Sequence, residues 1–178
     1  NGEEVDLCLC RTKAHFSQEG TTRVLTLDPV TIEFADLSLT LQTREYFEEG
    51  SGSIKIERTV LEMSNPKAQV ELNEYMVACY GTTEYPEDMT GITLTCEGTE
   101  TKTIAYEYRC REESLNGASA VSAVIPAIET KVSMTASAEA NGYIREGYAF
   151  SPMFTLGYKK NIRDKEMFAT WLNLEKAN

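Results

Sequence analysis

Hydrophobic and polar residues alternate along most of this chain. Val30, Ile32 and Phe34, for example, are separated by a threonine and a glutamate. A period of two is typical of a strand with one face in a core and the other in water. The same period occurs in residues 5–10, 24–27, 37–42 and 54–61. The first third of the chain is therefore predicted to be a series of half-buried strands.

Turn-forming residues interrupt this series. Pro29 and the pair Ala35-Asp36 divide residues 21–43 into two or three short strands. Residues 45–53 are predicted to be a flexible loop, because glycine and serine give it freedom and two glutamates keep it in water. The aromatic pair Tyr46-Phe47 at its base is suited either to anchor the loop or to contact a partner.

One helix is predicted at about residues 66–80. Asn65 is suited to cap its N-terminus, Pro66 fits its first position, and Gly81 fits its end. The apolar residues between them form a broad face, which we expect to pack on the outside of a sheet.

The C-terminal residues 161–175 fit two structures. The spacing of their apolar residues favours a short helix, with Asn161 as the cap and Asp164 in the first turn. A strand at residues 167–174 is the alternative.

The second half of the chain returns to strand-like patterns. Residues 92–96 and 104–110 are predicted strands joined by a turn at 97–100, and residues 111–120 are predicted to be a loop. Residues 143–150 and 153–158 are predicted to be a closing pair of strands. About ten strands with one helix indicate a mainly β domain, either an antiparallel β-barrel or a two-sheet sandwich with a flanking helix. We expect residues 1–178 to form a single domain, with residues 1–20 as an N-terminal arm.

Composition and charge restrict the partners. The 178 residues are 42% hydrophobic, and no run approaches the ~18 consecutive apolar residues of a membrane-spanning helix. The net charge is −11, so the surface should repel phosphate and anionic lipid. Specific nucleic-acid binding and membrane binding are therefore not expected.

Five cysteines are present, an odd number that cannot all pair within one chain. A simple hairpin would place Cys96 and Cys110 roughly 30 Å apart, too far for a disulfide. We expect mostly free thiols that pack as small hydrophobic groups in a reducing compartment.

The sequence offers little that would support catalysis. His15 is the only histidine, and no nucleophile, phosphate-binding or zinc motif accompanies it. No catalytic, cofactor-binding or metal-binding residues are predicted, and the chain is expected to work by contact rather than as an enzyme. A tyrosine set is suited either to a ligand platform or to the core: Tyr106, Tyr108, Tyr143, Tyr148 and Tyr158.

The order of these parts resembles that of bacteriophage tail-tube proteins and the related tubes of contractile injection systems. The matching parts are the strands at 24–43, the loop at 45–53, the strand at 54–63, the helix at 66–80 and the strands from 91 to 158.

The resemblance implies a structural, self-assembling subunit. Its copies would form rings, possibly hexameric, that stack into a tube with an acidic lumen, together with other virion proteins. It also implies a location in the virion or in the host cytoplasm during assembly. Inter-subunit contacts would be made by the loop residues Tyr46, Phe47, Glu48, Glu49 and Gly50.

A second hypothesis explains the same pattern. A secreted or surface β-sandwich that binds a protein or a glycan would also be rich in strands and tyrosines. This alternative places the protein outside the cell and predicts two disulfides with one spare thiol.

Overall fold

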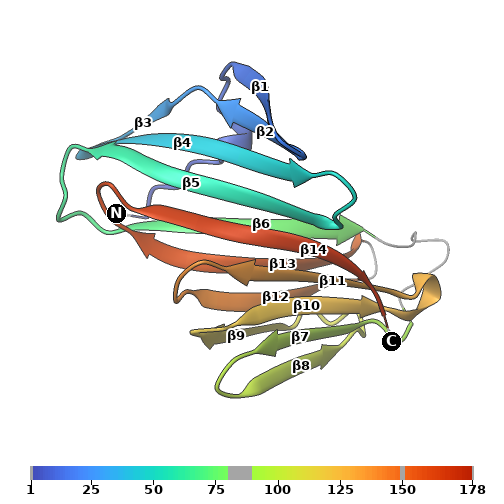
Figure 1. The fold of residues 1–178 in the computed structure, drawn as a ribbon. Helices are drawn as coiled ribbons and strands as arrows, with labels where there is room; N and C mark the ends of the chain where they lie inside the picture. The colour runs from blue at the N-terminus through green and yellow to red at the C-terminus, as the bar shows by residue number, and fades with distance from the viewer. Residues whose placement is uncertain (1, 80–89, 149–150, 178) are drawn as a thin grey trace. The chain divides into compact units, whose positions relative to one another are not determined.

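The computed structural model describes residues 2–79, 90–148 and 151–177 (Figure 1). Antiparallel strands in two sheets account for most of these residues. In chain order the strands are β1 (Ala14–Glu19), β2 (Thr22–Leu27), β3 (Val30–Phe34), β4 (Leu37–Glu48), β5 (Ser53–Met63), β6 (Val70–Cys79), β7 (Thr93–Glu97), β8 (Thr101–Ala105), β9 (Glu112–Asn116), β10 (Ala120–Ile125), β11 (Thr130–Ala136), β12 (Asn141–Tyr148), β13 (Ser151–Ile162) and β14 (Met167–Lys176). Two short 3-10 turns, Leu7–Leu9 and Pro126–Ile128, complete the described elements.

The chain divides into two compact units. Unit 1 holds residues 1–71 and 161–169, and unit 2 holds residues 72–160 and 170–178. In unit 1 the strands follow the order β1-β2-β4-β5. The long strand β4 pairs with β3 through its first residues and with β2 through its last residues. Pro29 lies between β2 and β3, so the predicted break in this region is confirmed.

The β4–β5 hairpin is more regular than the sequence suggested. Residues 45–48 belong to β4, and the hairpin turn covers only residues 49–52, so the prediction of a flexible loop over 45–53 is wrong for most of its length. Cross-strand contacts extend the ladder: Tyr46 lies opposite Lys55, whose Nζ atom is 4.9 Å from the centre of the tyrosine ring. Such pairs stabilise strands that propensity alone would leave open.

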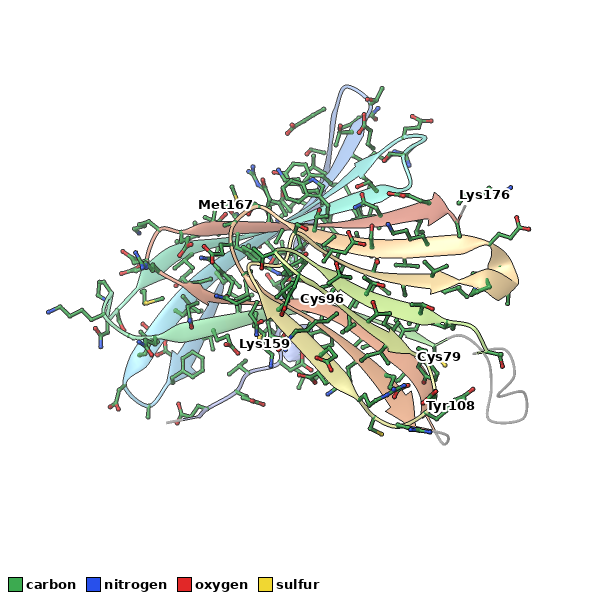
Figure 2. All side chains as sticks on the ribbon, turned by 90° about the horizontal axis from the view of Figure 1, so that it is seen from below. Cys79, Cys96, Tyr108, Lys159, Met167 and Lys176 are labelled. Carbon is green, nitrogen blue, oxygen red and sulfur yellow. The ribbon has the colours of Figure 1, made fainter. Side chains whose placement is uncertain are left out.

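Unit 2 is a sandwich of two layers. One layer has the strand order β14-β11-β10-β7-β8, and the other has the order β6-β13-β12-β9. Buried side chains from both layers meet between them: the Tyr158 hydroxyl donates to the Met134 carbonyl (3.2 Å), and the Cys96 thiol, labelled in Figure 2, lies 3.6 Å from the Gly142 carbonyl. A Cβ atom at Gly142 would come within 2.5 Å of Ala118 Cβ, so no side chain fits at this position without displacing its neighbours.

The predicted helix at 66–80 is wrong. Residues 70–79 form strand β6, and residue 80 lies outside the described residues. Asn65 does form a capping bond, since its side-chain oxygen accepts a hydrogen bond from the Lys67 N–H (3.1 Å). The turn that this bond closes is not continued into a helix. The same side-chain bonds cap helices and close isolated turns. Burial along β6 alternates, with Leu72 and Glu74 covered and their neighbours exposed, which is the signature of a strand.

The predicted C-terminal helix at 161–175 is also wrong. Strand β13 continues to Ile162, and β14 begins at Met167, which confirms the alternative of a strand at 167–174. Residues 130–136 of β11 supply the partner that decides this, pairing with residues 170–176 in register. Part of the predicted loop at 111–120 is strand β9, which pairs with β12.

The mainly β, two-sheet prediction is thus confirmed, and the flanking helix is not. The sheets do not close into a barrel within the described residues. No helix in the described part of the chain is long and apolar enough to cross a membrane. Among the described residues, Cys10, Cys79, Cys96 and Cys110 take part in no disulfide.

Candidate functional site

A row of small polar side chains crosses the outer face of the layer β14-β11-β10-β7-β8. Ladder pairing sets Thr103 opposite Thr95, Thr95 opposite Ser122, Ser122 opposite Ser133, and Ser133 opposite Asn173. One residue from each of five strands therefore lies on one line. We call these residues the polar row: Thr103, Thr95, Ser122, Ser133 and Asn173.

The row faces away from the sandwich because of strand alternation. Leu94 and Cys96 of β7 and Val121 and Ala123 of β10 are fully buried between the layers. Since successive side chains of a strand point to opposite faces, the residues between them point outward. The hydrophobic core therefore fixes the outward direction of Thr95 and Ser122, and their ladder partners share that face.

The two serines lie deepest in this face. Ser122 is only 3% exposed and Ser133 7% exposed. Within the described residues neither hydroxyl has a hydrogen-bond partner, and no side-chain nitrogen or oxygen is both fully buried and unpartnered. Neither hydroxyl oxygen is therefore completely enclosed. The other three side chains of the row make no side-chain hydrogen bond within the described residues either. Each hydroxyl offers one donor and two acceptor positions to a ligand.

An aromatic residue adjoins the row. Trp171, the only tryptophan of the chain, lies two residues before Asn173 on the same face of β14 and opposite Thr135. Its side chain is half-buried. An aromatic surface next to a few converging polar groups is the usual composition of a small-molecule site.

A buried carboxylate organises the segment that leads into β9. Glu146 of β12 is 1% exposed. Its Oε2 atom accepts from the Glu107 N–H (2.6 Å), and its Oε1 atom accepts from the Arg109 N–H (3.2 Å) and from Arg111 Nε (2.6 Å). Residues 106–111 are thereby held in a conformation in which Tyr108 has φ 59° and Cys110 has φ 56°. Left-handed backbone at two non-glycine residues is costly, and the bonds to Glu146 offset that cost.

These donors also set the ionisation of Glu146. Burial by itself raises the pKa of its carboxyl group. The hydrogen bond from Arg111, the backbone N–H groups and the guanidinium charge outweigh burial and hold the pKa below its ordinary value of 4.5. Glu146 is therefore ionised at neutral pH and acts as a structural anchor.

The residues singled out from the sequence lie elsewhere. Tyr46, Phe47, Glu48, Glu49 and Gly50 belong to unit 1, at the end of β4 and in the turn that follows it. The inter-subunit role suggested for them remains a prediction. His15, also in unit 1, is exposed and pairs with Asp28 at 2.9 Å.

Three of the five tyrosines belong to the buried interior rather than to an exposed platform. Tyr106, Tyr143 and Tyr158 are buried, and each hydroxyl has a partner within the protein. Tyr106 donates to the Met153 carbonyl (2.8 Å), and burial raises its pKa to about 12. The Tyr148 side chain lies outside what the structure describes.

Sequence patterns gave no direct signal for the polar row. Its members come from five separate strands, and each alone is an ordinary threonine, serine or asparagine. Alternation places each residue on the outer face, but only the register between strands puts all five on one line. Among the described residues no group of three potential metal ligands occurs.

No protein-family model and no curated protein matches the sequence. Solved structures do match the fold. The "putative aldose 1-epimerase" of Escherichia coli K12 aligns with 94% of this chain and 69% of its own at 9% identity, with a TM-score of 0.61. That of Klebsiella pneumoniae subsp. pneumoniae MGH 78578 aligns with 92% of this chain and 54% of its own at 8% identity, TM-score 0.62. A galactose mutarotase-like protein from Lactobacillus casei ATCC 334 aligns with 92% and 73% at 7% identity, TM-score 0.51.

These matches establish a shared fold. The chain is shorter than the proteins it matches: it spans 54% of the Klebsiella protein and 63% of another matching structure, HI1317.

The same matches correct three predictions. The resemblance to phage tail-tube proteins is wrong, because the fold is that of proteins described as epimerases and mutarotases. The prediction of a self-assembling virion subunit, which depended on that resemblance, is wrong as well. The prediction that the chain is not an enzyme is also contradicted, since the neighbours carry the names of enzymes that act on sugars. The alternative of a glycan-binding sandwich agrees better with the fold.

Proposed function

We propose that this chain binds carbohydrate through the polar row and the adjoining Trp171. The observation that carries the proposal is the row itself: five side chains in register, none with a side-chain hydrogen bond within the described residues. The fold supports it, because proteins with this fold are described as aldose 1-epimerases or mutarotase-like proteins.

The chemistry of the row suits a sugar. A sugar ring carries several hydroxyl groups that both donate and accept, and the serine and threonine hydroxyls can do the same in return. The ring also has an apolar face of C–H groups, which stacks on an aromatic side chain such as Trp171. The five strands are spaced by about 4.8 Å, so the row extends roughly 19 Å and is long enough for more than one sugar unit.

The single tryptophan provides the assay. Because Trp171 is the only one, its fluorescence reports on this face without interference from other tryptophans. We expect a saturable change in emission when a matching sugar is titrated from a panel of aldoses and their oligosaccharides. Calorimetry on the same samples checks that the change reflects binding.

Variants of the row test its role. Thr95→Val replaces one hydroxyl by a methyl group and keeps the branched shape of the side chain. Ser133→Ala removes one hydroxyl. Each hydrogen bond contributes about 1 kcal/mol, so each variant should weaken binding by roughly fivefold. Thr26→Val, in β2 of unit 1, is the matched control and should bind as the wild type does. The proposal is wrong if no sugar of the panel binds, or if the row variants bind like the control.

A further inference from the structure

The polar row differs from the two rows of side chains that flank it on the same face. It crosses five neighbouring strands (Figure 1), and in each of them it holds an uncharged hydroxyl or amide group. Threonines occur in the flanking rows as well, but other chemistries interrupt them. Glu97 and Trp171 lie on one side of the polar row, and Val124, Lys131 and Glu175 lie on the other. An unbroken series of uncharged polar groups therefore crosses all five strands.

The spacing of this series suits a linear glycan. Neighbouring strands of a sheet lie about 4.8 Å apart, so the polar row presents one hydrogen-bonding side chain at about that interval. Each sugar unit of an extended glycan advances the chain by close to the same distance. One sugar unit can therefore lie over each strand, and a chain of about five units matches the whole row.

The two ends of the polar row are different. At one end Trp171 lies beside Asn173 on β14, where a sugar ring can stack on the indole. At the other end β8 is the last strand of its sheet, and Thr103 is exposed. A glycan held at Trp171 can therefore follow the row to β8, and a longer chain can continue past that edge.

The weakness of each contact favours a long ligand. One hydrogen bond changes an affinity by about fivefold, whereas a ligand loses its overall translational and rotational freedom once, whatever its length. A single sugar ring reaches at most two neighbouring strands of the row and gains only those contacts. A ligand that follows the row adds further contacts against the same loss of freedom. The row is therefore better suited to an oligosaccharide than to a monosaccharide.

We propose that the polar row binds an extended, neutral, β-1,4-linked glycan that runs across the strands from Trp171 toward Thr103. This inference rests on the proposed function, that the chain binds carbohydrate through this row. A β-1,4 linkage keeps a chain of glucose units straight, whereas an α-1,4 linkage makes it coil away from a straight line. The uncharged side chains of the row can both donate to and accept from the hydroxyl groups of a neutral sugar.

The test compares two series of oligosaccharides that have the same glucose units and differ in linkage. Cellobiose to cellohexaose and maltose to maltohexaose are titrated by calorimetry and by Trp171 fluorescence. We expect the affinity of the β-1,4 series to rise by about fivefold for each unit that reaches a further strand, and to level off at about five units. The α-1,4 series should show no such rise.

Threonine variants establish the direction of the ligand. Thr103→Val should weaken binding of cellopentaose by about fivefold and leave cellobiose unchanged, because a short chain held at Trp171 does not reach β8. Thr93→Val and Thr101→Val make the same substitution on the same face of β7 and β8 but off the polar row, and they should bind both ligands as the wild type does. A ligand running along β7 would instead depend on Thr93 and not on Thr103. Each variant keeps the shape of the side chain, and circular dichroism checks its fold.

The outcomes separate this inference from the proposed function. If a monosaccharide binds as tightly as cellopentaose, if the two linkage series bind alike, or if Thr103→Val behaves like Thr93→Val, the extended glycan is refuted while carbohydrate binding stands. The same conclusion follows if another sugar binds and no cello-oligosaccharide does. If no saccharide binds at all, both proposals fail.

Discussion

Replacing Glu146 by glutamine should destabilise the fold strongly, even though the two side chains have the same shape. The carboxylate accepts from the Glu107 and Arg109 N–H groups and from Arg111 Nε. An amide has one oxygen, so its NH₂ group must face one of these donors. One N–H group is then left unsatisfied in a buried position, and the charge on the acceptor is lost.

The magnitude follows from burial. Breaking a buried ion pair by removing one partner typically costs about 3–5 kcal/mol, because the remaining charge is stranded. Here the Arg111 side chain is 40% exposed and can turn to water, so the loss should lie at or below the lower end of that range. We expect a loss of about 2–3 kcal/mol in the free energy of unfolding. For a chain of this length, this corresponds to a drop in Tm of roughly 4–12 °C.

The assay is urea unfolding followed by Trp171 fluorescence. Glu139→Gln, an exposed carboxylate of unit 2 with no ion pair among the described residues, is the matched control and should lie within about 0.5 kcal/mol of the wild type.

The pH dependence gives a second check. Because the folded pKa of Glu146 lies below 4.5, its ionised form contributes stability above that pH and loses the contribution as the pH falls through the folded pKa. The gap between wild type and Glu146→Gln should therefore be full at pH 7 and should shrink below pH 4.5. A Glu146→Gln variant as stable as the control, or a gap that is independent of pH, would refute the anchoring role.

Two further predictions concern glycine and cysteine positions. Gly157→Ala should lower the free energy of unfolding by about 1–3 kcal/mol, because the new methyl group displaces the Tyr143 ring. In a double-mutant cycle this loss should largely vanish in a Tyr143→Ala background. Equal losses in both backgrounds would mean that the ring contact is not the cause. Burial raises the pKa of the Cys96 thiol to about 11, so native protein treated with iodoacetamide should be alkylated at the exposed Cys79 and Cys110 and not at Cys96, by peptide mass spectrometry. Modification of Cys96 at the same rate as Cys110 would contradict its place in the core.

Strand content was accessible from the sequence, because alternation is a local property. The period of two at residues 30–34 and 37–42 reports which side chains enter a core, whatever strand comes next. Pro29 marks a break for the same local reason, since it lacks an N–H group for the ladder. The mainly β class and the two-sheet alternative were therefore predictable.

Local signals failed where one chemistry serves two structures. Asn65 and Pro66 are good helix-start residues, yet the Asn65 side chain closes a single turn and the chain continues as β6. The pattern of residues 161–175 fitted either a helix or a strand, and pairing of β14 with β11 decides for the strand. In both segments a neighbouring strand, distant in sequence, supplied hydrogen bonds that outweighed the local preference.

Where the period of two is regular, as at residues 30–34 and 37–42, the sequence by itself determined which residues face a core and which face water. Only the tertiary structure decided which outward-facing residues are neighbours, because register joins strands that are far apart along the chain. Only that pairing creates the line of residues from Thr103 to Asn173 and the contact between Tyr143 and Gly157. Hydrophobic burial sets the direction of each side chain. The ladder of backbone hydrogen bonds sets which side chains are its neighbours, and backbone hydrogen bonds leave no signal in the pattern of side chains.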